Sequence, residues 1–269
     1  MSATKTAAWR PAREGRALAT HAGAAAGSAV VLALLCALWW LASHRQWVSP
    51  VFVPTPEAAL ASLREGWQDG SLQAQSVATL QRMVGGWLIA SALGMALGAA
   101  IGTSAAARAW LQPLLEFVRP LPASAVMPLA MSIFGLSPAM VLAVVAFGAM
   151  WPVLLATLHG FANVEPRLRE VAAALQLTRG AAIWRIGLPS ALPDILAGMR
   201  LAMTVSLIVA VVGEMIASQT GLGQAILLAA RSFRASELFA GIALLGLIGF
   251  AANALLAAAE RRLLQWQRP

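Results

Sequence analysis

Residues 170–189 read EVAAALQLTRGAAIWRIGLP, a polar and patterned stretch in a chain whose neighbouring segments are strongly apolar. Pro166, just before it, suits the first turn of a helix, where a missing N–H costs nothing. Leu168, Val171 and Leu175 then recur at spacings of three and four, which puts one apolar stripe on a short helix. The stretch therefore predicts a short amphipathic helix between two membrane spans.

A second short helix is expected directly after the first. Thr178 can cap its start, and Gly180 loosens the junction between the two helices. Trp184 belongs to its apolar side, and we expect it to end before Leu188 and Pro189. Such a helix pair can lie on the lipid headgroups or dock a cytoplasmic partner, and the pattern alone leaves both roles open.

The composition indicates an all-α integral membrane protein. Of 269 residues, 59% are hydrophobic and 11% charged, and the mean hydropathy is +0.74. A soluble domain of this length carries roughly a quarter charged residues. The sequence pI near 11.6 comes almost entirely from arginine, which in so apolar a chain favours membrane topology signals over nucleic acid.

Cysteine and histidine usage argues against disulfides and metals. Cys36 is the single cysteine, so no intramolecular disulfide can form. His21, His44 and His159 are far apart and have no cysteine to help them, so we expect no metal site.

Six segments are long and apolar enough to cross a bilayer, which takes about 20 residues. Gly and Pro in FGLSP, residues 134–138, mark the expected turn between the third and fourth spans. The expected spans are 24–43, 83–107, two within 120–164, 195–218 and 238–259.

Both ends of the chain are basic, and an even number of spans puts them on one side. The positive-inside rule then makes both termini and the 170–189 stretch cytoplasmic, with Arg108 and Arg119 on the same side. The first apolar run is too long for a signal peptide and lacks a clean cleavage site, so we expect it to be retained. The predicted organisation is a cytoplasmic tail over 1–22, a six-span domain over 23–262 and a cytoplasmic tail over 263–269.

The chain lacks the residues of a nucleotide-hydrolysing site. A P-loop needs a lysine after a glycine-rich turn, and the single lysine, Lys5, lies in a polar segment without that pattern. We therefore expect no enzymatic activity and no cofactor in this chain, and any ATP-derived energy must come from a partner.

The 170–189 stretch resembles the EAA loop of ABC importer permeases, which docks the ATPase. Glu170, Ala172, Leu188 and Pro189 match that motif in identity and separation, whereas Gln176 stands where the motif has glycine. We therefore expect either a helix break shifted toward Gly180 or a longer first helix. The coupling residues that the resemblance implies, within a loop over 163–189, are Glu170, Ala172, Ala173, Gln176, Gly180, Leu188 and Pro189.

The resemblance extends over about residues 50 to 262 and is closest to nitrate/sulfonate/taurine-type permeases. VFVPTPEAAL (51–60) and VVGEMIASQTGLGQAI (211–226) are among the matching segments. It implies a type I ABC importer permease fold in the bacterial inner membrane and a pathway built with a second permease subunit, most simply another copy of this chain. It also implies two ATPase subunits that bind ATP and Mg²⁺, and a periplasmic binding protein that delivers a sulfonate, taurine or nitrate-like anion.

Three residues are candidates for the translocation pathway. Met127 lies in a segment that begins a pore-forming span in the family. Glu214 either lines the pathway or makes a structural hydrogen bond to a neighbouring helix. Arg200 could attract an anion, although a local pairing with Asp194 or a lipid headgroup is the favoured reading.

Two other classes of membrane protein would need residues that the spans largely lack. A stand-alone secondary transporter would need buried ionisable residues for ion coupling, and the spans offer little beyond Glu214 and His159. An intramembrane serine protease would pair a serine with a histidine, and no Gly-x-Ser-Gly elbow occurs.

Two further segments predict local structure. Gly86, Ala90, Gly94, Gly98 and Gly102 recur every four residues, which predicts close helix packing or, alternatively, a face that slides during gating. Residues 54–81 predict one or two extracytoplasmic amphipathic helices with a turn at DGS, either anchored on the membrane surface or contacting a binding protein.

Overall fold

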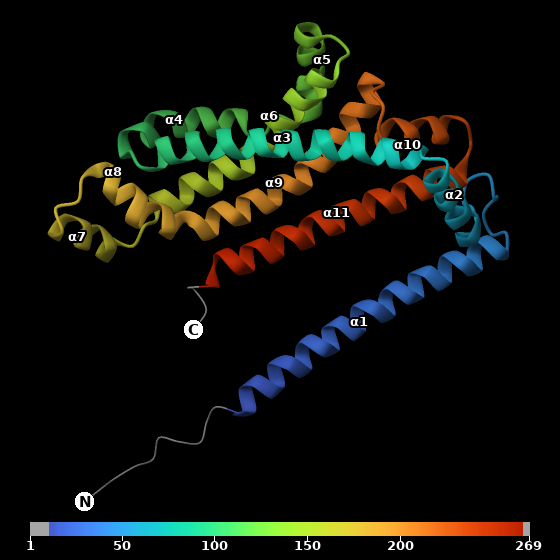
Figure 1. The fold of residues 1–269 in the computed structure, drawn as a ribbon, viewed down its shortest axis with the longest axis horizontal. Helices are drawn as coiled ribbons and strands as arrows, with labels where there is room; N and C mark the ends of the chain where they lie inside the picture. Colours follow the sequence, from blue (N-terminus) through green and yellow to red (C-terminus); the bar gives the residue numbers. More distant parts are fainter. Residues whose placement is uncertain (1–10, 266–269) are drawn as a thin grey trace, which may run out of the picture.

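The computed structural model describes residues 11–265, with side chains from residue 27 onward, and this part is helical throughout apart from turns (Figure 1). Residues 1–10 of the predicted N-terminal tail, 1–22, lie outside the described residues. The predicted C-terminal tail, 263–269, lies outside them from residue 266.

The helices follow one another through short connections. They are α1 (Pro11–His44), α2 (Pro56–Gln68), α3 (Ser71–Gly102), α4 (Ala105–Val118), α5 (Ala123–Phe134), α6 (Pro138–Ala162), α7 (Pro166–Ala174), α8 (Arg179–Ala182), the π-helical turn η1 (Ile183–Gly187), α9 (Leu188–Ala217), α10 (Leu222–Arg231) and α11 (Ala235–Leu263).

Five helical segments of the described chain are long and apolar enough to cross a membrane. The number is six, the predicted count, if the bent pair formed by α4 and α5 is one broken span, and five if that pair is a re-entrant loop. The five straight segments are Gly27–His44, Ser71–Gly102, Pro138–Ala162, Arg179–Ala217 and Ala235–Leu263.

The third span differs from its prediction. It was expected between residue 120 and the turn at 134–138, but α5 there has 12 residues, about 18 Å of helix, against a hydrocarbon core of about 30 Å. A crossing at this place would need α4 as well, and the two helices meet at 91°. Pro120 and Pro122 cause the break, because proline removes a backbone donor and disfavours helix in the residue before it.

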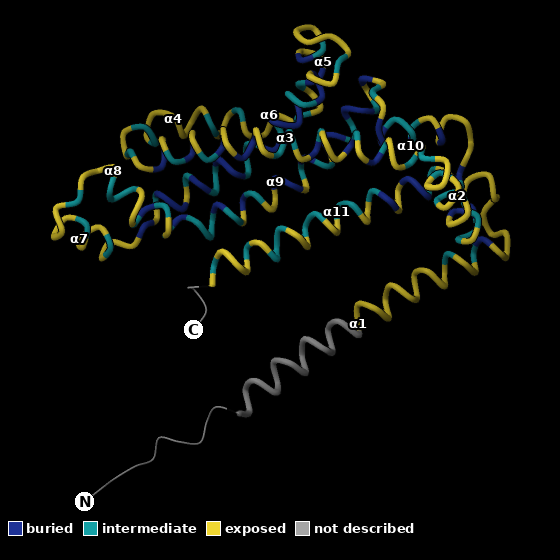
Figure 2. The backbone as a smooth tube through the Cα atoms, viewed as in Figure 1, coloured by how far each residue is buried: buried dark blue, intermediate teal, exposed yellow. Residues whose placement is uncertain are grey.

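A core of three helices, α3, α6 and α9, holds the molecule together, and its buried residues form the dark bands in Figure 2. The glycine row of α3 faces α6. A Cβ on Gly98 would lie 2.6 Å from the carbonyl oxygen of Leu154, and one on Gly94 would lie 2.8 Å from Cβ of Val153. The row thus permits close packing, as one of the two readings predicted.

Helices α1 and α11 lie toward the outside of the bundle. The described part of α1 exposes apolar side chains such as Leu32 and Leu35, and α11 exposes Phe250 and Leu255 (Figure 2). Such continuous apolar surface on a long helix suits contact with lipid tails.

The two ends of the bundle carry different elements. Helices α7 and α8 lie at one end, which we call the α7 end, and the C-terminal part of α11 runs toward that end (Figure 1). Helices α2 and α10 lie at the other, which we call the α10 end.

At the α10 end, the predicted turn at DGS is present. Helix α2 is capped by Thr55, whose hydroxyl accepts from Ala58 N at 3.3 Å, and it ends at Asp69 and Gly70. The second predicted helix is not separate. It continues from Ser71 into the membrane span as α3, since residues 71–84 contain no glycine or proline to break it.

Candidate functional site

Helix α7 ends in a Schellman motif at the position where the EAA loop has glycine. Leu177 N donates to Ala172 O, and Gln176 N donates to Ala173 O, both at 3.0 Å. Gln176 itself adopts the left-handed conformation, with φ of 49°. The break therefore stays at Gln176, and both expectations, a shift toward Gly180 or a longer first helix, are wrong.

The second short helix is capped as predicted but does not stop where predicted. The Thr178 hydroxyl accepts from Ala181 N at 3.3 Å and starts α8. The helix then runs through η1 into α9, so Leu188 and Pro189 lie in the first turn of a membrane span. The π-turn accommodates Pro189 within a continuous helix. Leu188 N donates to Ile183 O, five residues earlier, and α-helical hydrogen bonding resumes after Pro189.

The segment from α7 through η1 offers an apolar and charged surface at the α7 end. Val171, Leu175 and Trp184 are 48%, 65% and 72% exposed, and Glu170 is exposed beside them. Arg169 Nη2 donates to Ala162 O at 2.7 Å, which ties α7 to the end of α6. The predicted coupling residues Glu170, Ala172, Ala173, Gln176 and Gly180 thus lie on the segment from α7 to α8, whereas Leu188 and Pro189 lie in the first turn of α9. Figure 1 shows α7 and α8 projecting at one end of the bundle.

Glu214, a predicted pathway residue, lies fully buried at the α10 end of α9. Its carboxylate accepts from Arg82 Nη1 at 2.8 Å, Thr79 Oγ1 at 3.0 Å and Gly223 N at 3.0 Å. The reading of a structural hydrogen bond to a neighbouring helix agrees with this geometry.

The same network holds the turn between α9 and α10. Arg82 Nη1 also donates to Thr220 O at 2.6 Å, and Leu222 N donates to Thr79 Oγ1 at 2.9 Å. A Cβ on Gly221 would fall onto the Glu214 carboxylate, so no side chain fits there. Sequence reasoning missed Arg82 and Thr79, because their partners are more than 130 residues away along the chain.

Arg200 pairs with a different carboxylate from the one expected. Its Nη1 lies 3.5 Å from Glu260 Oε2 on α11. The expected pairing with Asp194 is wrong, because a separation of six residues places the two side chains on different faces of α9.

Met127 is 1% exposed and packs in the core with Met83 and Met203. Its predicted role in the pathway stays a prediction.

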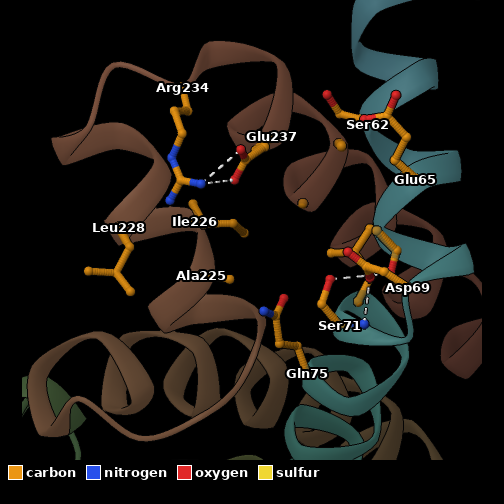
Figure 3. Close-up of a pocket in the computed structure, with 14 residues that line it drawn as sticks. Ser62, Glu65, Asp69, Ser71, Gln75, Ala225, Ile226, Leu228, Arg234 and Glu237 are labelled. Atoms are coloured by element: carbon orange, nitrogen blue, oxygen red, sulfur yellow. Dashed lines mark hydrogen bonds and ion pairs between the residues drawn. The ribbon is translucent and has the colours of Figure 1, made fainter.

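A cavity of about 390 Å³ opens at the α10 end between α2, the start of α3, α10 and α11 (Figure 3). Its polar lining includes Glu65, Asp69 and Glu237, with Arg234 Nη1 held 2.8 Å from Glu237 Oε2. Hydrogen bonds from the backbone and side chain of Ser71 hold the pKa of Asp69 below its usual value. The cavity is therefore acidic. Among the described residues no cluster of His, Cys, Asp and Glu could hold a metal ion.

Comparisons with known proteins agree with this architecture. Residues 90–265 match the family described as "Binding-protein-dependent transport system inner membrane component". The chain is 32% identical to the taurine transport system permease protein TauC of Escherichia coli (strain K12), covering 87% of each chain. It is 31% identical to the putative aliphatic sulfonates transport permease protein SsuC of Bacillus subtilis (strain 168), covering 87% of this chain and 85% of that one.

Two further matches cover less of the chain or are less similar in sequence. The nitrate import permease protein NrtB of Leptolyngbya laminosa is 33% identical, over 70% of this chain and 67% of that protein. An amino acid ABC transporter crystallised with histidines shares the fold, with a TM-score of 0.58, at 20% identity over 74% of this chain and 97% of that chain.

The family match covers most of the chain, and it excludes both the secondary transporter and the intramembrane protease. Such a component works with a binding protein and an ATPase, and it does not itself catalyse a reaction. The chain belongs to the binding-protein-dependent inner membrane components, the multi-pass permease subunits of ABC importers.

Proposed function

We propose that this permease imports a small solute with an oxyanion group, such as a sulfonate, taurine or nitrate. The relatives named for taurine, aliphatic sulfonates and nitrate support this class, because sulfonate and nitrate groups share negatively charged oxygens. We propose that two copies of the chain form the pathway, and that the α7 end and both termini are cytoplasmic.

The single observation that carries the coupling role is the segment from α7 through η1. It projects from the bundle, exposes the apolar side chains of Val171, Leu175 and Trp184, and continues without a break into α9. An ATPase subunit that binds this surface would move α9 when it moves the docked helices. Glu170, beside the apolar patch, adds a charge for partner recognition.

The test compares one tryptophan at each end of the bundle. Trp184 on η1 is 72% exposed and Trp67 on α2 is 48% exposed. Trp184→Asp should abolish co-purification of the ATPase and solute uptake, while Trp67→Asp should leave the ATPase bound. Retention of the ATPase by Trp184→Asp would contradict docking through this segment.

A further inference from the structure

A second concave site, of about 330 Å³, lies halfway along the bundle. It is formed by the junction of α4 and α5 together with the middle of α6 and α9. Its lining includes Gly148, Trp151 and Pro152 of α6, and Leu201 and Val205 of α9. These residues are near the centres of two membrane spans, so the groove lies at mid-depth.

Arg119 is the charged residue of this groove. It was expected at the cytoplasmic surface, but α4 runs back along α3 for 14 residues before reaching it (Figure 1). An arginine at this depth is costly unless it faces water, a partner charge or a ligand. Its nearest acidic neighbour along the chain, Glu116, accepts instead from Gln112 at 3.0 Å. Within residues 27–265, no ion pair of the Arg119 side chain is found.

The groove offers the exposed Arg119 guanidinium as a hydrogen-bond donor and no acceptor side chain. The Trp151 indole N–H makes no hydrogen bond in the described part of the chain but is buried beneath the groove surface, so Arg119 is the donor that a solute reaches. The other lining side chains are apolar. A lining of this kind favours an anionic group. It disfavours a cation, and also a neutral solute with few hydrogen-bond acceptors.

The remaining candidate sites are less suited to an anion. Arg82 and Arg200 each already face a carboxylate, Glu214 and Glu260 respectively. The cavity at the α10 end carries more carboxylates than cations, so it would repel an anion.

We infer that the groove at Arg119 binds the oxyanion group of the transported solute at the middle of the membrane. The planar guanidinium of Arg119 pairs with two oxygens of a sulfonate or nitrate, a geometry that lysine cannot reproduce. Leu201 and Val205 pack against the short aliphatic part of a sulfonate. This inference rests on the proposed function, since it takes the solute to be an oxyanion.

The experiment uses the complete transporter, with its ATPase and binding protein, in proteoliposomes. Uptake of radiolabelled taurine and of nitrate is measured for wild type, Arg119→Gln and Arg119→Lys. Arg262→Gln serves as the matched control, because Arg262 is an exposed arginine in the last turn of α11 and does not line the groove. ATP hydrolysis stimulated by the binding protein is followed in parallel.

We expect Arg119→Gln to raise the KM for the transported anion at least tenfold, with Arg119→Lys between it and wild type and Arg262→Gln equal to wild type. ATPase co-purification and the melting temperature of each variant show that it is folded and assembled. An unchanged KM in a folded Arg119→Gln overturns the site and leaves the proposed function standing. Wild-type transporter that hydrolyses ATP but moves neither anion overturns the proposed substrate class, and the site with it.

Discussion

Arg82 Nη1 on α3 lies 2.8 Å from Glu214 Oε1 on α9, and this buried pair joins two spans at the α10 end. The Arg82 side chain is 13% exposed, and the Glu214 side chain is fully buried. Removing one partner of such a pair leaves an uncompensated charge, which typically costs about 3–5 kcal/mol. The pair therefore fixes where α3 and α9 meet.

Removing one charge of the Arg82–Glu214 pair should destabilise the protein more than removing both charges. We expect Arg82→Met and Glu214→Gln each to lower the melting temperature of the detergent-purified protein clearly. The double variant should lose less than the sum of the two losses, because no lone charge stays buried. Strictly additive losses would show that the two side chains act independently.

The turn before α10 should not tolerate a side chain at Gly221. A methyl group there would displace the Glu214 carboxylate from Arg82, Thr79 and Gly223. Gly221→Ala should therefore reduce the yield of folded protein. Gly246→Ala on α11, where a Cβ has nothing within 4 Å, should match or exceed wild type in the same assay.

Gln176 has a left-handed backbone conformation, so we expect its replacement by glycine to stabilise the coupling loop. Gln176→Gly should remove about 1 kcal/mol of backbone strain. The expected readout is slower hydrogen exchange of the amides at the end of α7, by roughly fivefold. Gln176→Val should accelerate the same exchange, and equal rates in both variants would mean that the conformation at this position carries no strain.

Two glycines of α3, Gly98 within the row and Gly85 outside it, should respond differently to an added methyl group. Gly98→Ala meets the backbone carbonyl of Leu154, which cannot move aside, and should lower the melting temperature. At Gly85 the nearest atom is the flexible tip of Leu142, 3.3 Å away, so Gly85→Ala should be nearly neutral. Similar effects at the two positions would argue against tight packing of α3 on α6.

Local patterns along the chain predicted much of this molecule. Pro166 and Thr178 marked the starts of α7 and α8, and the apolar periodicity between them indicated a short helix. FGLSP marked the turn before α6, where Ser137 accepts from Met140 N. These signals are readable because each acts within a few residues of its own position.

The parts that escaped prediction depend on distant partners or on competing local preferences. Nothing near Arg82 in the sequence points to Glu214, and nothing near Arg200 points to Glu260. At Gln176 a poor residue for the left-handed conformation still accepts it, because the two Schellman hydrogen bonds and the capped helix that follows fix the turn. Arg119 was misplaced because its depth depends on where Pro120 and Pro122 bend the chain.

The unbroken helical path from Arg179 to Ala217 has a mechanical consequence. Its 39 residues correspond to a rod of about 58 Å, longer than the hydrocarbon core is thick. One end carries Trp184 on the exposed surface, and the other carries Glu214, clamped to α3. A displacement of the first end is therefore transmitted to the far side of the membrane without crossing a loop, and the irregular positions along the path are the π-turn and Pro193 within α9. By the same geometry, a displacement of the turn around Glu214 also moves Trp184, so conformational coupling between the two faces of the membrane acts in both directions.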